Sequence, residues 1–455
     1  MSDRERFGAS VRRSRRSVLR TSGAALAAAG VAGCVGGGGD GGGGGGSVEA
    51  VNDKLTLWHA MGSGGNGETL NALGDQFEEE TGIPINMEFQ DSYESVLTNF
   101  LGALESGQVP DFAQIDSLFA KQVLNTGRVD PVEELLSEEF PVDDLLPNVT
   151  DFFTIDGTLQ SLPFNNSNAI MYYNRTAFEE AGLDPDSPPE TLAEVRSASE
   201  TLVESGVVDA GITWPNHVWF VEHWFSTAGR LLFDAENGHA GEPSTLLTDN
   251  DTARSLYEWW RGMADDGLYI NPGIEAWQEA TSAFLQQEAA MLLTSTAFVA
   301  GARSGAEKNG FEVDNAFYPT VGEERVGPVI GGASFFVPSG LPDDRREDVG
   351  AFLEFMASPD VQKQWHKGTG YYPIRQTAVD ELSSEGWFEE NPMFRTALDQ
   401  LQASADDPAT KRMLVEPARQ SQQYVQNTSV EVFSGDTSVE DGLSKMKSRV
   451  EGELS

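Results

Sequence analysis

Residues 1–51 differ in composition from the rest of the chain. The folded body of the protein is therefore expected to begin after them. Arg15 and Arg16 form a twin-arginine motif, which is typical of bacterial export signals. The apolar run over residues 23–32 is too short to span a bilayer as a stable helix. We therefore expect residues 1–33 to be a twin-arginine signal peptide.

The signal ends in a series of small residues, 31–33, followed by Cys34, which is similar to the lipobox of exported lipoproteins. This is the only cysteine in the chain, so no disulfide can form within it. Residues 36–46 are all glycine except Asp40, a composition typical of a flexible coil. We expect residues 34–51 to be a lipidated cysteine and a tether, holding the protein at the outer face of the membrane. The alternative is a short N-terminal membrane helix with a buried cysteine.

The part of the chain after the tether is too long for a single hydrophobic core, at about 400 residues, so two domains or a two-lobed body are expected. Hydrophobic residues make up 39% of the sequence, with 9 Trp and 25 Phe, which excludes general disorder. No later stretch is long and apolar enough to predict a membrane helix.

The charge balance is strongly acidic, with 72 acidic and 30 basic residues and a formal net charge of −42. The acidic residues are scattered, which favours a solvated surface over an interaction tail. This pattern resembles proteins of salt-loving archaea, in which high salt shortens the Debye length to roughly 3 Å at 1 M. Nucleic acid is excluded as a partner because no basic face is available to neutralise phosphates.

The first part of the body reads as alternating strands and helices. Residues 54–59 and 83–89 alternate in the manner of strands, and residues 68–81 and 93–105 have helical spacing. A short strand is expected over residues 112–115. This order predicts a mainly parallel sheet with helices on both faces, and ligands usually bind at the carboxyl ends of such strands.

The pattern changes in the second part, where residues 190–270 are mostly helical and strands are expected near 289–294 and 335–337. We predict an α/β fold of two interleaved lobes. The expected crossings lie near residues 163–168, 292–297 and 368–374. The expected lobes comprise 52–163 plus 297–372, and 164–296 plus 373–455.

Three blocks of sequence carry a resemblance to a known family. They cover residues 162–189, with Leu-Pro-Phe-Asn-Asn-Ser at the start, residues 330–334, and residues 365–374. In this order they resemble the extracellular solute-binding proteins (family 1) of ABC importers for carbohydrates, most closely the glycerol-3-phosphate-binding branch. The resemblance implies a type II periplasmic-binding-protein fold with crossing hinge strands, which closes around one small molecule and needs no cofactor.

The resemblance also implies the ligand contacts. In the glycerol-3-phosphate-binding branch they fall on positions that match Tyr93, Ser167, Ser295, Gly332 and Tyr371. Their chemistry suits the role, because tyrosines offer flat apolar faces and hydroxyls, serines donate to oxygens, and glycine lets a backbone amide approach closely.

Two positions depart from the pattern of that branch. Ser117 stands where the branch has a contacting glutamate, and Asp116 beside it is a candidate replacement. The arginine that grips the phosphate falls on Gln422, so Arg419 is the nearest cation. Without an arginine in the pocket, so acidic a protein is poorly suited to bind a dianionic phosphate.

Further aromatic and ionisable residues have two interpretations each. The spacing of Trp214, Trp219 and Trp224 is typical of packing inside the second lobe, and the alternative is that Trp214 or Trp219 reaches the cleft. We retain Trp214 as a ligand candidate. The five histidines are dispersed without metal-ligand spacing, so no metal site is expected.

We thus expect a monomeric, non-enzymatic, substrate-binding lipoprotein of an ABC importer, with the permease subunits and the membrane as partners. Glycerol 3-phosphate or a glycerophosphodiester is the first ligand hypothesis, and a neutral sugar or oligosaccharide is the second. From another class, a secreted phosphodiester or glycan hydrolase is the alternative, although no Gly-x-Ser-x-Gly elbow or Walker loop is present. A passive adhesion protein would explain the anchor but not the two lobes.

Overall fold

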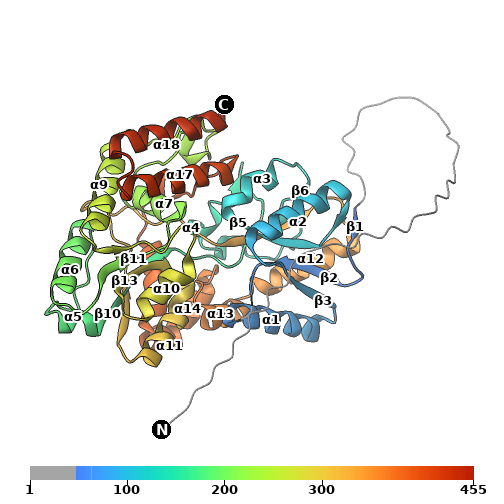
Figure 1. Cartoon of the computed structure of the whole chain (residues 1–455). Helices are drawn as coiled ribbons and strands as arrows, with labels where there is room; N and C mark the ends of the chain where they lie inside the picture. The colour runs from blue at the N-terminus through green and yellow to red at the C-terminus, as the bar shows by residue number, and fades with distance from the viewer. Residues whose placement is uncertain (1–47, 63) are drawn as a thin grey trace, which may run out of the picture. The chain divides into compact units, whose positions relative to one another are not determined.

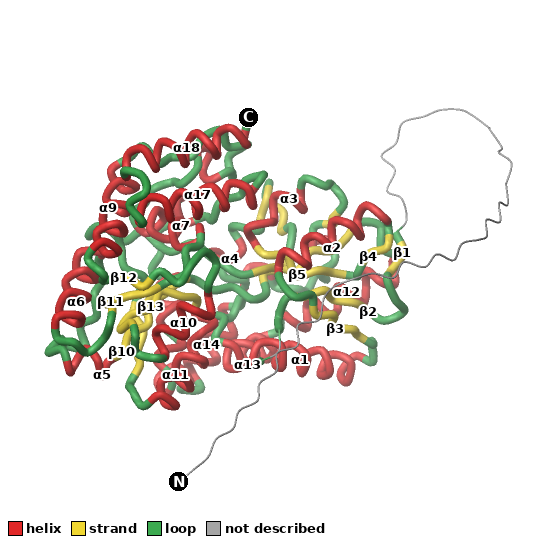
Figure 2. Tube along the Cα trace, in the orientation of Figure 1, coloured by secondary structure: helices red, strands yellow, loops and turns green. Residues whose placement is uncertain are grey.

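A computed structural model describes residues 48–62 and 64–455, so the predicted signal peptide, Cys34 and most of the tether lie outside it. The described part contains two larger sheets, each flanked by helices (Figure 1). The strands gather in two separate groups, drawn in yellow in Figure 2. This is the two-lobed α/β arrangement that the sequence predicted.

The sheet of the first lobe has the order β3-β2-β5-β15-β6, with β9 paired to β15. As predicted, the strands formed early in the chain are parallel, because β2 pairs in parallel with β3 and with β5. The sheet as a whole is mixed, since β15 returns antiparallel to β5. Its strands are β2 Leu55–His59, β3 Ile85–Phe89, β5 Phe112–Asp116, β6 Val129–Asp130, β9 Leu162–Pro163 and β15 Ala333–Pro338.

Local sequence explains the helices of the first lobe. Helix α2 starts where the Ser92 side chain accepts from the Ser95 amide, and α1 and α2 end at the left-handed glycines Gly82 and Gly107. The helices of this part are α1 Gly65–Thr81, α2 Tyr93–Ser106, α3 Ala120–Leu124, α4 Pro147–Thr150, α12 Asp343–Met356 and α13 Pro359–Thr369.

The sheet of the second lobe has the order β12-β11-β13-β10-β14. Strand β10, which lies between β13 and β14, is buried at every position and runs antiparallel to both of them. Strand β11 interrupts the region predicted to be mostly helical. The strands are β10 Ala169–Asn174, β11 Ala210–Thr213, β12 Tyr269–Ile270, β13 Ala289–Ser295 and β14 Val313–Ala316.

Most of the remaining helices belong to the second lobe. Helices α17 and α18 pack against each other and against α9 at one end of the molecule in Figure 1. The helices are α5 Arg175–Glu180, α6 Leu192–Glu204, α7 Val218–Thr227, α8 Asp234–Asn237, α9 Asp251–Asp265, α10 Trp277–Leu285, α11 Val299–Asn309, α14 Gln376–Ser384, α15 Trp387–Glu390, α16 Thr396–Gln402, α17 Ala418–Phe433 and α18 Val439–Leu454. Short two-stranded sheets pair β1 Glu49–Ala50 with β4 Gln108–Val109, and β7 Thr154–Ile155 with β8 Thr158–Leu159.

The chain passes between the two sheets along segments that lie side by side. The first runs from β9 to β10, and the second from β14 to β15. Ser167 and Gly331 exchange backbone hydrogen bonds of 3.2 and 2.7 Å between these segments. In a third segment, the Tyr372 amide donates to the Asn166 carbonyl at 3.3 Å.

The second crossing lies later than the predicted 292–297. Strand β14 still pairs with β10, and α11 packs in a cluster with β10, β13 and α10. Residues 299–316 therefore pack with the second sheet, whereas the predicted division assigned them to the first lobe. No helix is predicted from the sequence over residues 299–309, and no sequence signal indicates which sheet α11 covers.

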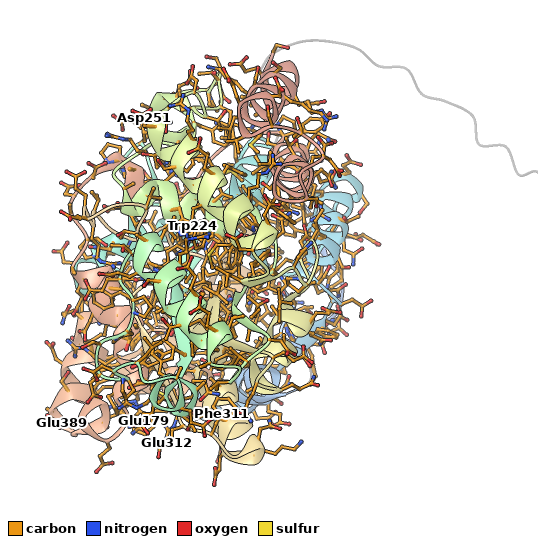
Figure 3. The ribbon with its side chains drawn as sticks, turned by 60° about the vertical axis from the view of Figure 1, so that its left-hand side comes forward. Glu179, Trp224, Asp251, Phe311, Glu312 and Glu389 are labelled. Carbon is orange, nitrogen blue, oxygen red and sulfur yellow. The ribbon has the colours of Figure 1, made fainter. Side chains whose placement is uncertain are left out.

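The interior is aromatic and the surface acidic. Trp224 lies among the inner side chains in Figure 3, whereas Asp251 and Glu389 project at the outline of the molecule. Within the described residues, no helix combines the length and the apolar character needed to cross a membrane.

Candidate ligand-binding site

A cavity of about 420 Å³, here called the front cavity, lies beside the crossing segments and is lined by both lobes. The predicted ligand residues that line it are Tyr93, Asp116, Ser167, Ser295, Gly332 and Tyr371. Residues that were not among those predictions also contribute: Ala60, Ser92, Glu94, Leu118, Phe119, His217, Trp219, Glu275, Trp277, Gly331, Arg412 and Gln422. Six positions spread over almost 280 residues of sequence are thus brought together.

The two tyrosines are held as neutral hydroxyl groups. The Tyr93 hydroxyl accepts from Asn165 Nδ2 at 2.8 Å, and Asn165 Oδ1 accepts from Gln114 Nε2 at 2.7 Å. Burial raises the pKa of Tyr93 well above its usual value, and Tyr371 and Asp116 add to the rise. Burial also raises the pKa of Tyr371, whose ring stacks on Trp365 at 5.7 Å between centroids. Both can therefore donate a hydrogen bond to a ligand.

Close contacts with neighbouring atoms explain why the second crossing has glycine at positions 331 and 332. A Cβ at Gly331 would lie 2.6 Å from the Trp219 ring, and a Cβ at Gly332 would lie 1.8 Å from the Asn165 carbonyl oxygen. Gly332 also has φ +90°, which disfavours any other residue. Trp219 Nε1 donates to the Ile330 carbonyl at 3.2 Å. The glycines thus let an indole ring and a backbone carbonyl pack directly on the hinge.

The two serines are fixed by the backbone around them. Ser167 is held by its paired hydrogen bonds with Gly331. Ser295 ends β13, where its hydroxyl accepts from the Ala297 amide at 3.1 Å. Both border the front cavity, and each hydroxyl can serve a ligand oxygen.

A buried arginine that the sequence analysis missed lies at the wall of the cavity. Arg412 is 2% exposed; its Nη1 donates to Asp116 Oδ1 at 3.1 Å and to Ser117 Oγ at 2.5 Å. Its Nε donates to Glu222 Oε2 at 3.4 Å. Burial raises the pKa of Asp116 and of Glu222, and the Arg412 charge opposes that rise. Arg412 lies in a loop after the short 3-10 helix Pro408–Thr410 and belongs to no motif, so only its neighbours in the folded structure reveal it.

Ser117 does not line the cavity, although it was predicted to contact the ligand. It is fully buried, and its hydroxyl donates to the Gly332 carbonyl at 3.0 Å while accepting from Arg412. In this structure Ser117 holds Arg412 and the glycine segment in place.

Arg419 lies next to the cavity, but it is not one of the lining residues. Its Nη1 is 2.7 Å from Glu94 Oε1 and 3.9 Å from Glu275 Oε1, both from residues of the lining. Its side chain is 41% exposed, so the pair with Glu94 spans α17 and α2 in contact with solvent.

Gln422, at the position of the expected arginine, lines the cavity and is already engaged. Its Nε2 donates to Glu275 Oε1 at 3.1 Å and lies 2.9 Å from His217 Nε2. Burial lowers the pKa of His217 to about 3, with Arg412 and Arg419 contributing, so the imidazole is neutral. This corner of the cavity therefore offers amide and imidazole groups, with a negative charge only from Glu275.

The structure corrects the assignment of Trp214. This residue is fully buried, 4.1 Å from the Tyr269 ring and 5.7 Å from the Trp259 ring between centroids, and it does not line the cavity. The packing interpretation describes it better. Trp219, the other residue of that alternative, does line the cavity, together with Trp277.

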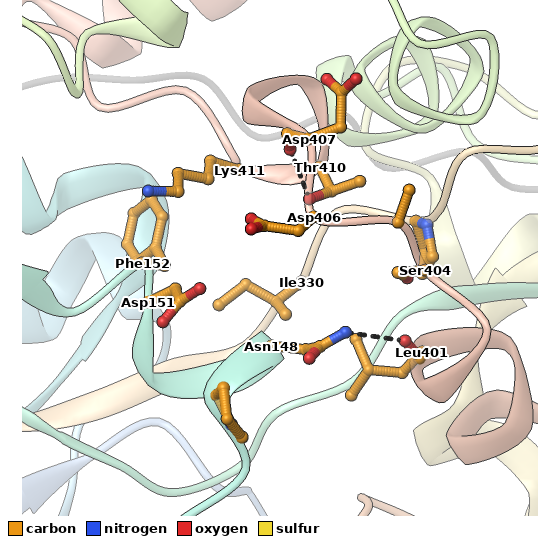
Figure 4. Close-up of a pocket in the computed structure, with 13 residues that line it drawn as sticks. Asn148, Asp151, Phe152, Ile330, Leu401, Ser404, Asp406, Asp407, Thr410 and Lys411 are labelled. Atoms are coloured by element: carbon orange, nitrogen blue, oxygen red, sulfur yellow. Dashed lines mark hydrogen bonds between the residues drawn. The ribbon is translucent and has the colours of Figure 1, made fainter.

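A second space, the rear cavity of about 260 Å³, also borders the second crossing (Figure 4). Pro328 and Ile330 line it, whereas Gly331 and Gly332 line the front cavity. Asn148 donates to the Leu401 carbonyl at 2.9 Å in its wall. Over residues 48–62 and 64–455, no group of three or more His, Cys, Asp or Glu is arranged to hold a metal.

Comparison with known proteins now identifies the family. A family model described as bacterial extracellular solute-binding protein matches residues 72–396. The chain belongs to this family. A curated relative of the solute-binding protein, sn-glycerol-3-phosphate-binding periplasmic protein UgpB of Rhizobium meliloti (strain 1021), is 27% identical over 407 residues. The match covers 87% of this chain and 92% of the relative.

Solved structures share the fold. UgpB from Mycobacterium tuberculosis in complex with glycerophosphocholine matches with a TM-score of 0.75 at 19% identity, covering 89% of this chain and 98% of its own. The GacH receptor of Streptomyces glaucescens GLA.O, whose structures include an acarbose complex, matches with a TM-score of 0.74 at 18% identity, covering 90% and 99%.

These comparisons confirm the predicted family and the two-lobed periplasmic solute-binding fold. The solute-binding protein belongs to the ABC importer systems for sugars and glycerol phosphates, whose members are extracellular or periplasmic. The curated relative is named as a binding protein, which weighs against the hydrolase alternative.

Proposed function

We propose that this solute-binding protein is the substrate-binding lipoprotein of an ABC importer, capturing a small polar solute between its lobes and delivering it to the permease. The composition of the front cavity carries the proposal. Aromatic faces, hydroxyls and charged groups of both lobes surround one space beside the crossing segments. A ligand that bridges both lobes favours their closed arrangement, which the permease subunits then recognise.

The first ligand candidate is glycerol 3-phosphate or a glycerophosphodiester, and the name of the Rhizobium relative supports it. Charge distinguishes the phosphomonoester from the phosphodiester within this class. Three carboxylates (Glu94, Asp116 and Glu275) and one guanidinium (Arg412) line the cavity. A phosphomonoester brings a charge of about −1.5 to −2 at pH 7, whereas a diester has a single ionised oxygen. We therefore favour the diester within this class.

A neutral sugar or oligosaccharide is the second candidate, favoured by a specific observation. Arg412 and Arg419 are both paired with carboxylates, which offset the positive charge that either arginine presents to an anion. Trp219 and Trp277 offer apolar faces on which the C–H bonds of a sugar ring can stack.

The proposal extends to the N-terminal region outside the described residues. We propose that residues 1–33 direct export by the twin-arginine route and that Cys34 carries a lipid. The protein then works as a monomer on the outer face of the membrane. Replacing Cys34 with Ser should release the protein from membranes into the soluble fraction, and continued sedimentation with membranes would contradict the anchor.

Calorimetric titration tests the ligand class. We expect the Cys34→Ser chain to bind glycerophosphocholine more tightly than glycerol 3-phosphate, and small-angle scattering to show a smaller radius of gyration with ligand. If maltose alone releases heat on titration, a neutral sugar replaces the phosphorylated compounds as the favoured ligand. Release of choline on incubation with glycerophosphocholine would revive the hydrolase. No binding of any of these compounds, with unchanged scattering, contradicts solute capture.

A further inference from the structure

We propose that three contacts between surface residues of the two lobes form a clasp, which holds the lobes together and determines how long a ligand stays in the front cavity. The clasp consists of Glu94 with Arg419, Lys121 with Glu242, and Asn125 with Glu416. The inference rests on the proposed function and deepens it, because it assigns retention of the ligand to residues that need not touch the ligand.

The clasp joins elements that lie far apart in the sequence. Its first-lobe side comes from helices α2 and α3, with Lys121 inside α3 and Asn125 directly after it. Its second-lobe side is the start of α17 and the loop that follows α8. Helix α17 also contacts the 3-10 turn Ser117–Phe119, which leads into α3. The three contacts therefore lie along one boundary between the lobes.

Two of the three contacts are ion pairs that reach solvent. Lys121 Nζ lies 2.6 Å from Glu242 Oε1, and the two side chains are 18% and 71% exposed. Arg419 Nη1 lies 2.7 Å from Glu94 Oε1, with both side chains about two-fifths exposed. Pairs of this kind are weak one by one, and dissolved salt screens them.

One of the ion pairs lies where the front cavity meets solvent. Glu94 of α2 and Gln422 of α17 both line the cavity. Arg419 lies one turn before Gln422 on α17, and its pair with Glu94 is partly exposed. Two helices that wall the cavity, one from each lobe, are thus joined at its edge. These helices can separate to release a ligand only when this pair breaks.

The clasp acts on the equilibrium between the closed and open arrangements of the folded lobes. Its contacts join the lobes, so they are lost when the lobes separate. A ligand that bridges the lobes binds the closed arrangement, and its apparent affinity follows the fraction of protein that can close. Because small free energies change this fraction, contacts that add little to the stability of the fold can still change ligand retention. The dissociation rate should change more than the association rate, since a ligand enters while the clasp is open.

The test measures both rates by the fluorescence of Trp219 and Trp277, which line the front cavity. The parent is the Cys34→Ser chain, and the probes are maltose and glycerophosphocholine. The clasp variant, Lys121→Gln/Arg419→Gln, removes the positive charge from both ion pairs. Melting temperatures establish that each variant is folded.

The control variant, Arg196→Gln/Lys447→Gln, removes the same charges from two exposed ion pairs within the second lobe. Arg196 pairs with Glu200 at 2.9 Å, and Lys447 pairs with Asp249 at 2.8 Å. It reproduces the change in net charge without touching the boundary between the lobes.

We expect the clasp variant to release the probe that the parent binds about 2- to 10-fold faster than the parent, as for the loss of two exposed ion pairs. The association rate should change less. Raising KCl from about 0.05 to 1 M should accelerate release from the parent and the control variant more than from the clasp variant, which has no clasp charges left to screen in pairs.

Reversal of one pair separates the clasp from contact with the ligand. Neither Lys121 nor Glu242 lines the front cavity. Lys121→Gln alone should nevertheless accelerate release, and the reversed pair Lys121→Glu/Glu242→Lys should restore the rate of the parent.

The outcomes separate the clasp from the proposed function. A folded clasp variant that releases its ligand at the rate of the parent overturns the clasp and leaves solute capture intact. An equal acceleration in the control variant, or a reversed pair that restores nothing, also overturns the clasp. A parent that binds neither probe contradicts the proposed function, and scattering from the ligand-free chains then decides. A larger radius of gyration for the clasp variant than for the control variant supports the clasp, and equal radii overturn it.

Discussion

At the scale of single residues, positions that touch a fixed backbone are the most constrained. Gly332 is the clearest case, since the Asn165 carbonyl occupies the place of a side chain. The family resemblance pointed to Gly332 as a ligand contact. The structure adds a second reason for glycine there, namely its positive φ and the contact with the first crossing.

Gly332→Ala should therefore destabilise the protein by about 1–3 kcal/mol, the cost of holding a non-glycine residue in such a conformation, and more if the crossings separate. Urea unfolding measures the effect. Gly102, inside helix α2 with no atom within 4 Å of its added Cβ, is the control. Gly102→Ala should stabilise the protein by up to about 1 kcal/mol. Equal stability of the two variants would contradict this account of Gly332.

Sequence patterns identify some of the residues that line the front cavity and miss others. Tyr93 and Tyr371 lie in recognisable positions, and the structure brings them to one cavity. Arg412 and Glu275 lie in loops without a motif, and their importance comes from partners far away in the chain. Trp214 and Trp219 are alike in the sequence, and only the direction of each ring separates core from cavity.

At the scale of elements, periodicity located helices α1 and α2 and several strands, but it did not show to which sheet the later elements belong. Strand β11 has only four residues between helical stretches, and all four are buried, so no alternation reveals it. Helix α7 is buried at every one of its positions, and so lacks the polar face by which a surface helix is recognised.

Helix α7 also carries a pH-dependent contribution to stability. His223 on this helix is fully buried, where its Nε2 accepts from the Ala169 amide at 3.0 Å and its Nδ1 lies 2.8 Å from the Trp219 carbonyl. Burial lowers the pKa of His223 to about 3. The unfolded chain, with a pKa near 6.5, therefore binds the proton more readily than the folded protein.

This histidine stabilises the fold fully above about pH 6.5, and its contribution falls as the pH drops toward 3, by about 1.4 kcal/mol per pH unit. Asp111 has the opposite effect on the pH dependence of stability. Burial raises its pKa to about 6, so its contribution to stability increases as the pH falls. Comparison of the parent chain with His223→Gln isolates the histidine. The variant should be less stable at pH 8 and lose less stability between pH 7 and 5, measured by urea unfolding. Parallel pH profiles would contradict the assignment.

At the scale of the whole molecule, the net charge of −42 dominates. Like charges on the compact state repel one another, and dissolved salt screens them over about 10 Å at 0.1 M. Contacts between first-lobe and second-lobe residues include ion pairs with exposed partners, such as Lys121 with Glu242 at 2.6 Å and Arg419 with Glu94 at 2.7 Å. Salt weakens these pairs, but each contributes little.

We therefore expect the melting temperature to rise as KCl is increased from 0.01 to 0.5 M, because relief of self-repulsion outweighs the loss of a few exposed pairs. Differential scanning calorimetry measures this. The Lys121→Gln variant should show a rise at least as large, since one attractive pair is absent. A melting temperature that falls with salt would show that the ion pairs prevail.

The two cavities share a wall at the second crossing. Ile330 borders the rear cavity and the adjacent Gly331 borders the front one. Ligand binding in the front cavity would therefore take place one peptide unit away from the rear cavity. Ser404 lines the rear cavity, and the sequence has a single cysteine, at position 34. A fluorescent dye could be attached to a cysteine introduced at Ser404 once Cys34 is replaced. It would lie in the rear cavity, outside the proposed ligand site, and its fluorescence should change when a ligand binds in the front cavity. The labelled protein would then serve as an optical sensor for its own ligand.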